Sequence, residues 1–320
     1  VGAPRPDTRL PQTRPSRRLP GHRILPCLPF RADTLLNGRP RQTASLNNPG
    51  TMALNHKAHS GLFSWGPYRI PTGDPLVLRI GEVAVFVRTK QDEIWISHLP
   101  APGDGPSPPP PPDSDEHWER WGASQSPDEV EVLPLFPDRA LVLRPENPFH
   151  LLPGARARIY VRVPLWIRLS VPGASGGTIL ELPTIPLSET WWGDYLEGET
   201  SYWLHIRARR SAPRELMTGD RIFCPLALAN DAEEELPVEQ ILLRCGHLAV
   251  FRGQESLWSD EVRVRYRGED VGSELEMTGR TPREAPGAPL LTPPRSPLAR
   301  GFTARTFARL RRLPGLGLGF

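Results

Sequence analysis

Apolar and polar positions alternate along residues 155–171, which read ARARIYVRVPLWIRLSV. Every odd position carries an apolar residue, whereas the even positions hold mostly arginine and aromatic side chains. Because successive side chains of a β-strand point to opposite faces of its sheet, this period of two predicts a strand with one buried and one outer face. The outer row of arginines is therefore either a binding surface for an anion or a solvated face.

Short runs with strand-like patterns recur from residue 62 to about residue 275, with prolines or glycines at nearly every junction. They occupy residues 76–80, 82–88, 93–99, 130–136, 139–144, 178–183, 200–209, 221–230, 238–252 and 261–267. The runs 82–88 and 93–99 are joined by four residues and predict a hairpin. No ten-residue helical pattern separates the runs, so we expect an all-β fold. It is either one antiparallel β-sandwich or two stacked sandwiches that divide near 172–177.

These patterns divide the chain into a β-sandwich domain over residues 62–275 and a Pro-rich tail over 276–320. A Pro-rich loop over 101–128 interrupts the domain, and its five consecutive prolines (108–112) predict an exposed polyproline II segment on an unanchored surface insertion. Prolines after Met277 predict that order fades in the tail. The tail ends in a short basic amphipathic segment over 302–313, which suits a membrane surface or an acidic partner.

Composition changes this picture at the N-terminal end of the chain. Residues 1–51 contain nine arginines, nine prolines and only two acids, without a sustained apolar period. Two explanations stay open: a disordered basic arm, or residues read from upstream of a start at Met52, with Val1 as a literally decoded GTG codon. Without residues 1–51 the net charge of +3 becomes −4, so the rest of the chain is mildly acidic.

The types of charged and sulfur-containing residues narrow the class of protein further. Only two lysines, Lys57 and Lys90, accompany the many arginines, which a GC-rich coding bias explains without any ligand. Cys27, Cys224 and Cys245 have no disulfide or zinc spacing, and they fit a reducing compartment. No apolar run approaches the ~18 residues that span a bilayer, and no signal peptide is apparent. We therefore expect a cytoplasmic protein.

Arginine alternates with apolar residues on three of the predicted strands, 155–171, 200–209 and 261–267. The candidate anion-binding residues are Arg156, Arg158, Arg162, Arg168, Arg207, Arg209, Arg263, Arg265 and Arg267. Like charges facing one another destabilise a sheet, so such a face needs either a polyanion or neighbouring acids such as Glu181, Glu261 and Glu269. A salt-bridged face is the simpler interpretation, because the coding bias already explains the arginines.

A second candidate site lies in residues 187–199, LSETWWGDYLEGE, where carboxylates flank aromatic rings as in sugar-binding clefts and glycosidase pairs. Its candidate residues are Trp191, Trp192, Asp194, Tyr195 and Glu197. The same composition is also typical of a loop that covers a sandwich edge with its tryptophans packed inward, and we prefer that interpretation.

No catalytic motif in the sequence lies in a structural context that suits catalysis. Residues 173–177 match G-x-S-x-G, but strands are predicted on both sides of them, whereas a nucleophile elbow needs a helix after its serine. The histidines share no metal-ligand spacing. We therefore predict a non-enzymatic protein with no catalytic residue, no metal site and no cofactor.

Several stretches of the chain resemble a known family. They are WGPYRIPTGDPLVLRIGEVAVFVR, RIYVRVPLWIRLSV with LPTIPLSETWWGD, RIFCPLALANDAEEELPVEQILLR, and LAVFRGQESLWSDEVRVRYRGED. Over about residues 62–275 the chain resembles the prokaryotic family called domain of unknown function 432, which has no established activity or catalytic residues. The resemblance implies a cytosolic accessory role, for example as a partner of a small mechanosensitive channel.

Three functional hypotheses follow. The first is a binding or accessory protein whose partner is another protein. The second is a polyanion binder, for nucleic acid, a phosphate ligand or anionic lipid, which uses the arginine face and the C-terminal segment. The third is a carbohydrate-active protein that uses residues 191–199.

Overall fold

β-Strands dominate the computed structural model, together with single-turn 3-10 helices and no α-helix in its described part. The structure describes residues 63–103, 108–123, 127–171, 177–193, 196, 198–213, 216, 219–268 and 273–296, and the backbone of 303–304. All of them belong to the unit Lys57–Phe320. The expectation of an all-β fold is confirmed. Among these residues, no helix is long and apolar enough to cross a membrane.

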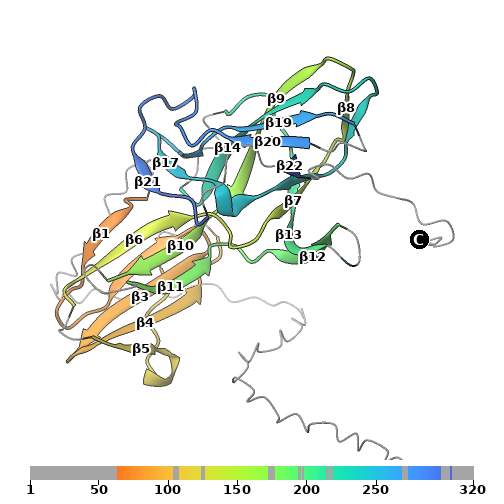
Figure 1. Cartoon of the computed structure of the whole chain (residues 1–320). Coiled ribbons are helices and arrows are strands. Elements are labelled where there is room, and N and C mark those ends of the chain that lie inside the picture. The colour runs from red at the N-terminus through yellow and green to blue at the C-terminus, as the bar shows by residue number, and fades with distance from the viewer. Residues whose placement is uncertain are drawn as a thin grey trace, which may run out of the picture. The chain divides into compact units, whose positions relative to one another are not determined.

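The strands form several sheets (Figure 1). One four-stranded sheet has the order β1 (Gly66–Arg69), β6 (Glu129–Leu135), β10 (Trp166–Ser170) and β11 (Thr178–Pro183). A second has the order β2 (Leu76–Ile80), β3 (Val83–Lys90), β4 (Glu93–Pro100) and β5 (Glu119–Gly122). A third has the order β12 (Ser188–Trp192), β13 (Glu199–Ile206), β7 (Leu141–Pro145) and β16 (Ile241–Leu243). β15 (Leu236–Val238) pairs with β8 (Phe149–Leu151).

The eight-stranded sheet is built around the long strand β14 (Arg221–Asn230). Its path runs through β21 (Leu290–Thr292), β17 (Val250–Arg252), β18 (Leu257–Ser259), β14, β19 (Val262–Tyr266), β20 (Ser273–Met277) and β22 (Thr303–Ala304). β9 (Arg156–Pro164) pairs with β14 over nearly its whole length. β18 and β19 pair with successive halves of β14. The 3-10 helices include η1 (Asp115–His117) and η3 (Cys245–His247).

The first two four-stranded sheets are antiparallel throughout, as expected, but the third four-stranded sheet and the eight-stranded sheet also include parallel pairs. β7 pairs parallel with β13, and β14 pairs parallel with both β18 and β19. Parallel neighbours need a long crossover rather than a tight turn, and both partners lie far apart in the sequence here. The local alternation of apolar and polar residues does not indicate which distant strand a given strand pairs with, or in which direction.

The arginine-rich stretch 155–171 forms two strands rather than one. β9 belongs to the eight-stranded sheet, whereas β10 pairs with β6 and β11. Leu165 lies between them, fully buried, and its carbonyl accepts hydrogen bonds from the N–H and the hydroxyl of Thr184. The predicted burial of the odd positions is confirmed on both strands, because Ile159 and Leu169 are both buried in the same core cluster.

The Pro-rich loop is anchored at its C-terminal half, contrary to the expectation of an unanchored insertion. Trp118 is 5% exposed and packs with Phe86 and Trp95, and its indole N–H donates to the carbonyl of Pro112 at 3.2 Å. β5 then pairs with β4. Aromatic burial and one ladder of hydrogen bonds therefore hold this segment against the second sheet.

Residues 278–296 are also packed, although the sequence predicts that order fades after Met277. β21 pairs with β17, and Thr292 is buried and donates its hydroxyl to the carbonyl of Pro134 at 2.6 Å. The Arg295 guanidinium binds the carbonyl of Phe136 and the carboxylate of Glu181. Contacts with residues distant in the sequence therefore order this Pro-rich segment. Residues 1–62 and the side chains of 302–313 lie outside the described part.

Candidate anion-binding pocket

The predicted arginine face exists on the eight-stranded sheet. β14 lies between β9 and β19, and its Ala227 is flanked by Arg158 and Arg263. Ala229 is flanked in the same way by Arg156 and Arg265. The structure thus brings together arginines from two strands that the sequence places about one hundred residues apart.

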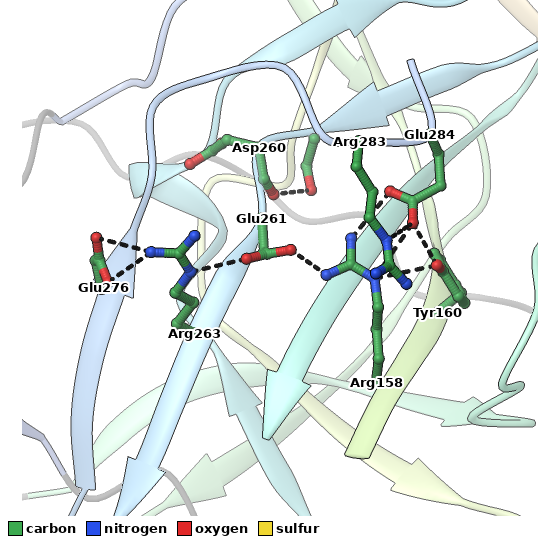
Figure 2. Close-up of polar contacts among 9 residues, drawn as sticks. Arg158, Tyr160, Asp260, Glu261, Arg263, Glu276, Arg283 and Glu284 are labelled. Atoms are coloured by element: carbon green, nitrogen blue, oxygen red, sulfur yellow. Dashed lines mark hydrogen bonds and ion pairs between the residues drawn. The ribbon is translucent and has the colours of Figure 1, made fainter. Parts of the chain in front are cut away.

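Carboxylates bind three of the arginines on this face. Arg158 lies between Glu261 on one side and Glu284 with Tyr160 on the other (Figure 2). Arg263 lies between Glu261, at 2.8 Å, and Glu276, at 3.3 Å. Arg267 pairs with Glu274 at 2.7 Å.

Burial and hydrogen bonding act in opposite directions on these carboxylates. Burial would raise the pKa of Glu261, but hydrogen bonds from Arg158 and Arg263 outweigh it, and the pKa lies below its usual value. The pKa of Glu284 is lowered in the same way, since its hydrogen bonds with Tyr160, Arg283 and Arg158 outweigh burial. Both carboxylates are therefore stabilised as anions by their partners.

Other candidate arginines are paired elsewhere or stay exposed. Arg168 follows β10 into another sheet and pairs with Glu181 at 3.0 Å, and Arg207 pairs with Glu146 at 3.3 Å. Two further candidates, Arg156 and Arg265, are exposed and make no ion pair within the described residues. The salt-bridged interpretation therefore describes the face better than a continuous row of uncompensated charge.

A cavity of about 260 Å³ opens beside this face, where β9, the chain after β13 and the start of β14 meet. Its charged and ionisable lining consists of Glu146, Arg162, His205, Arg207, Arg209 and Arg221. Its remaining lining consists of Tyr160, Val161, Ile206, Ala208, Ser211, Leu216 and Phe223. Arg162 and Arg209, both predicted candidates, are therefore brought together with Arg221, which the alternation pattern does not single out.

A break in strand β13 places Arg209 in the pocket. The sequence predicts a strand through residue 209, but β13 ends at Ile206, and Ala208 adopts a left-handed φ of 43°. The chain then returns to β9, where the Tyr160 N–H donates to the Arg209 carbonyl at 2.7 Å. The alternation that would have put Arg207 and Arg209 on one outer face is lost at this bend.

Substituting Ala208 with glycine is expected to raise the free energy of unfolding by about 0.5 to 1 kcal/mol. A left-handed φ costs an L-residue ~1–2 kcal/mol, which outweighs the ~0.4–1 kcal/mol that glycine adds to the entropy of the unfolded chain. Denaturant unfolding measures the difference, with A157G on β9 as control. Ala157 lies at an ordinary strand position, so A157G should lose stability. An equal loss of stability in A208G would show that the left-handed backbone at Ala208 is not strained.

Four arginines and one carboxylate, that of Glu146, belong to the described lining of the pocket. Burial, and then the charges of Arg221 and Arg209, lower the pKa of Arg162, with Asp220 opposing. Arg221 is 3.8 Å from Asp220. The Nε–H of Arg209 is buried and has no hydrogen-bond partner among the described residues. A buried donor of this kind costs free energy unless an acceptor occupies the space beside it.

The aromatic and acidic candidates do not assemble a cleft within the described part. Trp191 and Trp192 take opposite faces of β12: Trp191 is 53% exposed, and Trp192 is buried against Val142 and Trp203. Asp194, Tyr195 and Glu197 lie outside the described residues. The inward packing that we expected for the tryptophans is thus confirmed for Trp192 alone.

The carboxylates described on this sheet are held in ion pairs. Glu189 pairs with Arg139 at 2.7 Å, and Glu199 pairs with Arg244 at 2.8 Å. Within the described residues, no group of three or more His, Cys, Asp or Glu side chains could hold a metal ion. Cys224 and Cys245 are buried free thiols, and burial raises the pKa of both.

Comparison with known proteins supports the resemblance seen in the sequence. A family model described as "Protein of unknown function (DUF432)" matches residues 64–311, which is more than half of the chain. The match spans every strand named above and all of the pocket lining. The curated proteins and the solved structures contain no match. The chain belongs to the DUF432 family.

Proposed function

We propose that this protein is a non-enzymatic binding module that holds a small anionic ligand in the pocket of Arg162, Arg209 and Arg221. The observation that carries the proposal is the convergence of three half-buried arginines, Arg162, Arg209 and Arg221, on one cavity, where the charges of Arg209 and Arg221 act on Arg162. Guanidinium groups present planar pairs of N–H donors, which suit the oxygens of carboxylate and phosphate. The partly enclosed site strengthens such charged hydrogen bonds relative to water.

The pocket has more support as a ligand site than the arginine face. On the face, Arg158, Arg263 and Arg267 are already held by carboxylates, so a polyanion would have to displace internal partners. The accessory role that the family resemblance implies, with a protein such as a mechanosensitive channel as partner, stays a prediction, and so does the carbohydrate hypothesis.

We also propose a sandwich arrangement for the first two sheets. Val85 and Val87 of β3 share one core cluster with Val130 and Val132 of β6. The intervening Phe86 belongs to a separate cluster with Trp118. Alternate residues of β3 thus contact different layers, which supports face-to-face stacking of two sheets.

The test is binding of inorganic phosphate to the full chain by isothermal titration calorimetry. We expect R162Q, R209Q and R221Q each to weaken binding about 10- to 100-fold, because a hydrogen bond to a charged group contributes about 1.5–3 kcal/mol. R265Q is the matched control, since Arg265 is exposed on the arginine face. Its affinity should equal that of the unmodified protein.

Two results would contradict the proposal. One is an affinity for phosphate that the three pocket substitutions leave unchanged. The other is heparin binding that falls steeply with salt and is lost in R265Q but kept in R209Q, which would move the site to the arginine face.

A further inference from the structure

Resting on the proposed function, we infer that the ligand is a small monocarboxylate with an apolar body, and that Arg209 pairs with its carboxylate through two parallel N–H donors. Two features of the pocket lead to this chemistry. One is the arginine that internal partners leave available, and the other is the apolar cluster that forms the floor of the pocket.

Three of the four arginines in the described lining interact with other groups of the protein. Arg207 pairs with Glu146 at 3.3 Å, and Arg221 lies 3.8 Å from Asp220. Arg162 also interacts with another group of the chain. These three guanidinium groups therefore add to the positive potential of the pocket, but they already have partners of their own.

Arg209 differs from these three arginines. Among the described residues no ion pair reaches its side chain, and its buried Nε–H has no hydrogen-bond acceptor. Its backbone is fixed, because the Tyr160 N–H donates to the Arg209 carbonyl and the chain bends at Ala208. The Nε–H and the adjoining Nη–H of a guanidinium form a planar fork, which a carboxylate accepts with its two oxygens. One carboxylate therefore satisfies the donor that the fold leaves open.

An apolar cluster forms the floor of the same pocket. Tyr160 and Phe223 line the pocket and belong to a cluster with Trp258 and Ala285, and Leu216 packs against that cluster. An apolar cavity of ~150 Å³ holds a benzene molecule. The volume of about 260 Å³ therefore leaves room for a ring of that size together with a carboxylate. An aromatic or branched aliphatic acid fits both features of the pocket.

A phosphate monoester suits this arrangement less well. It carries about −1.5 to −2 charges at pH 7 and presents three acceptor oxygens. Its second negative charge would be repelled by the carboxylate of Glu146 in the lining, and beyond Arg209 it would meet arginines that already have partners. We therefore expect a monocarboxylate to bind at least as tightly as a phosphate monoester of similar size.

The test compares benzoate, benzamide, acetate and phenyl phosphate on the full chain by isothermal titration calorimetry at pH 7.5. Benzoate should bind at least tenfold more tightly than benzamide, which has a similar shape without the charge, because hydrogen bonds to a charged group are the stronger ones. Benzoate should also bind about tenfold more tightly than acetate, which lacks the ring. Phenyl phosphate should bind no more tightly than benzoate.

Substitutions of Arg209 test the paired donors. R209Q should weaken benzoate binding about 10- to 100-fold, and R209K should weaken it about tenfold, since lysine keeps the charge but not the planar fork. R156Q is the matched control, because Arg156 is an exposed arginine of β9, and its affinity should equal that of the unmodified protein. Denaturant unfolding of each variant separates lost binding from lost folding, and the comparison of the four molecules needs no variant.

The possible failures are distinguishable. Tighter binding of phenyl phosphate than of benzoate would overturn the carboxylate and leave the anion pocket standing. Equal affinity for acetate and benzoate would overturn the apolar body, and full affinity in R209K would overturn the paired donors. If benzamide binds as tightly as benzoate, or if neither benzoate nor phosphate binds, the proposed function itself fails.

Discussion

Replacing Asp260 with alanine is expected to lower the free energy of unfolding by about 3 kcal/mol. Asp260 is 1% exposed, at the break between β18 and β19. Its two carboxylate oxygens accept the backbone N–H groups of Ala249, at 3.0 Å, and Gly279, at 3.1 Å. Alanine leaves both donors without an acceptor, and each buried unsatisfied donor costs about 1–3 kcal/mol.

The position of Asp260 explains why replacing this one side chain should lower the free energy of unfolding so strongly. Ala249 directly precedes β17, and Gly279 follows β20, so the carboxylate ties two flanking strands to the point where β18 gives way to β19. Burial raises the pKa of Asp260, and the hydrogen bonds from Ala249 and Gly279 counteract that rise in part. The side chain is therefore a structural connector that works only with both N–H groups in place.

Denaturant unfolding of D260A and D260N measures this contribution. Asparagine keeps one carbonyl oxygen but turns an amide group toward the second N–H, so D260N should lose less stability than D260A. D231A is the matched control, because Asp231 is exposed and its side chain makes no described contact, and it should stay within about 0.5 kcal/mol. If D260A unfolded at the same denaturant concentration as D231A, the connector role would be wrong.

The sequence predicts the burial of individual strands well, because that information is local. The period of two along residues 155–171 correctly identifies Ile159, Val161 and Ile167 as core residues. It cannot reveal that the strand changes sheet at Leu165, since both halves keep the same alternation. Which sheet a strand joins depends on partners such as β14 and β6, which lie elsewhere in the chain.

The candidate site likewise combines features that the local sequence shows with features that only the folded chain shows. Arg158 is visible as an outer residue, but its partner Glu284 follows 126 residues later in a Pro-rich segment. Nothing in the local pattern marks Ala208 as left-handed, so the convergence of Arg209 with Arg162 is a property of the folded chain. One feature of the sequence does indicate that the Pro-rich loop is anchored. The loop contains Trp118, and large aromatic side chains are highly buried on average.

Replacing Arg158 with methionine is expected to lower the free energy of unfolding at pH 7 by about 3 kcal/mol. This is the lower end of the ~3–5 kcal/mol that breaking a buried ion pair costs, because Glu261 and Glu284 each keep another partner. The Arg158 side chain is 17% exposed, and those of Glu261 and Glu284 are 15% and 17% exposed (Figure 2). Methionine fills much of the volume of the side chain. It leaves Glu261 with Arg263, and Glu284 with Tyr160 and the exposed Arg283.

The dependence on pH distinguishes lost charge from lost packing. In the wild type the pKa values of Glu261 and Glu284 lie below the usual 4.5, so these groups contribute stability that is present above that pH. This stability is lost as the pH falls through the lowered pKa values of the folded state. In R158M burial has less opposition, both pKa values rise, and protonation relieves the variant at a higher pH. The difference in stability between the two proteins should therefore narrow from pH 7 to pH 4.

Unfolding by urea at pH 7, 5.5 and 4 measures that difference, with R156M as the matched control. Arg156 lies two residues away on β9, is exposed and makes no ion pair within the described part, so its substitution should cost less than about 0.5 kcal/mol at every pH. A gap between wild type and R158M that stays constant across the three pH values would mean that methionine merely packs badly beside Tyr160. A gap that closes toward pH 4 means that the arginine face is stabilised by its own carboxylates. An external polyanion would then be unnecessary on that face, and the proposed ligand site would be confined to the pocket beside it.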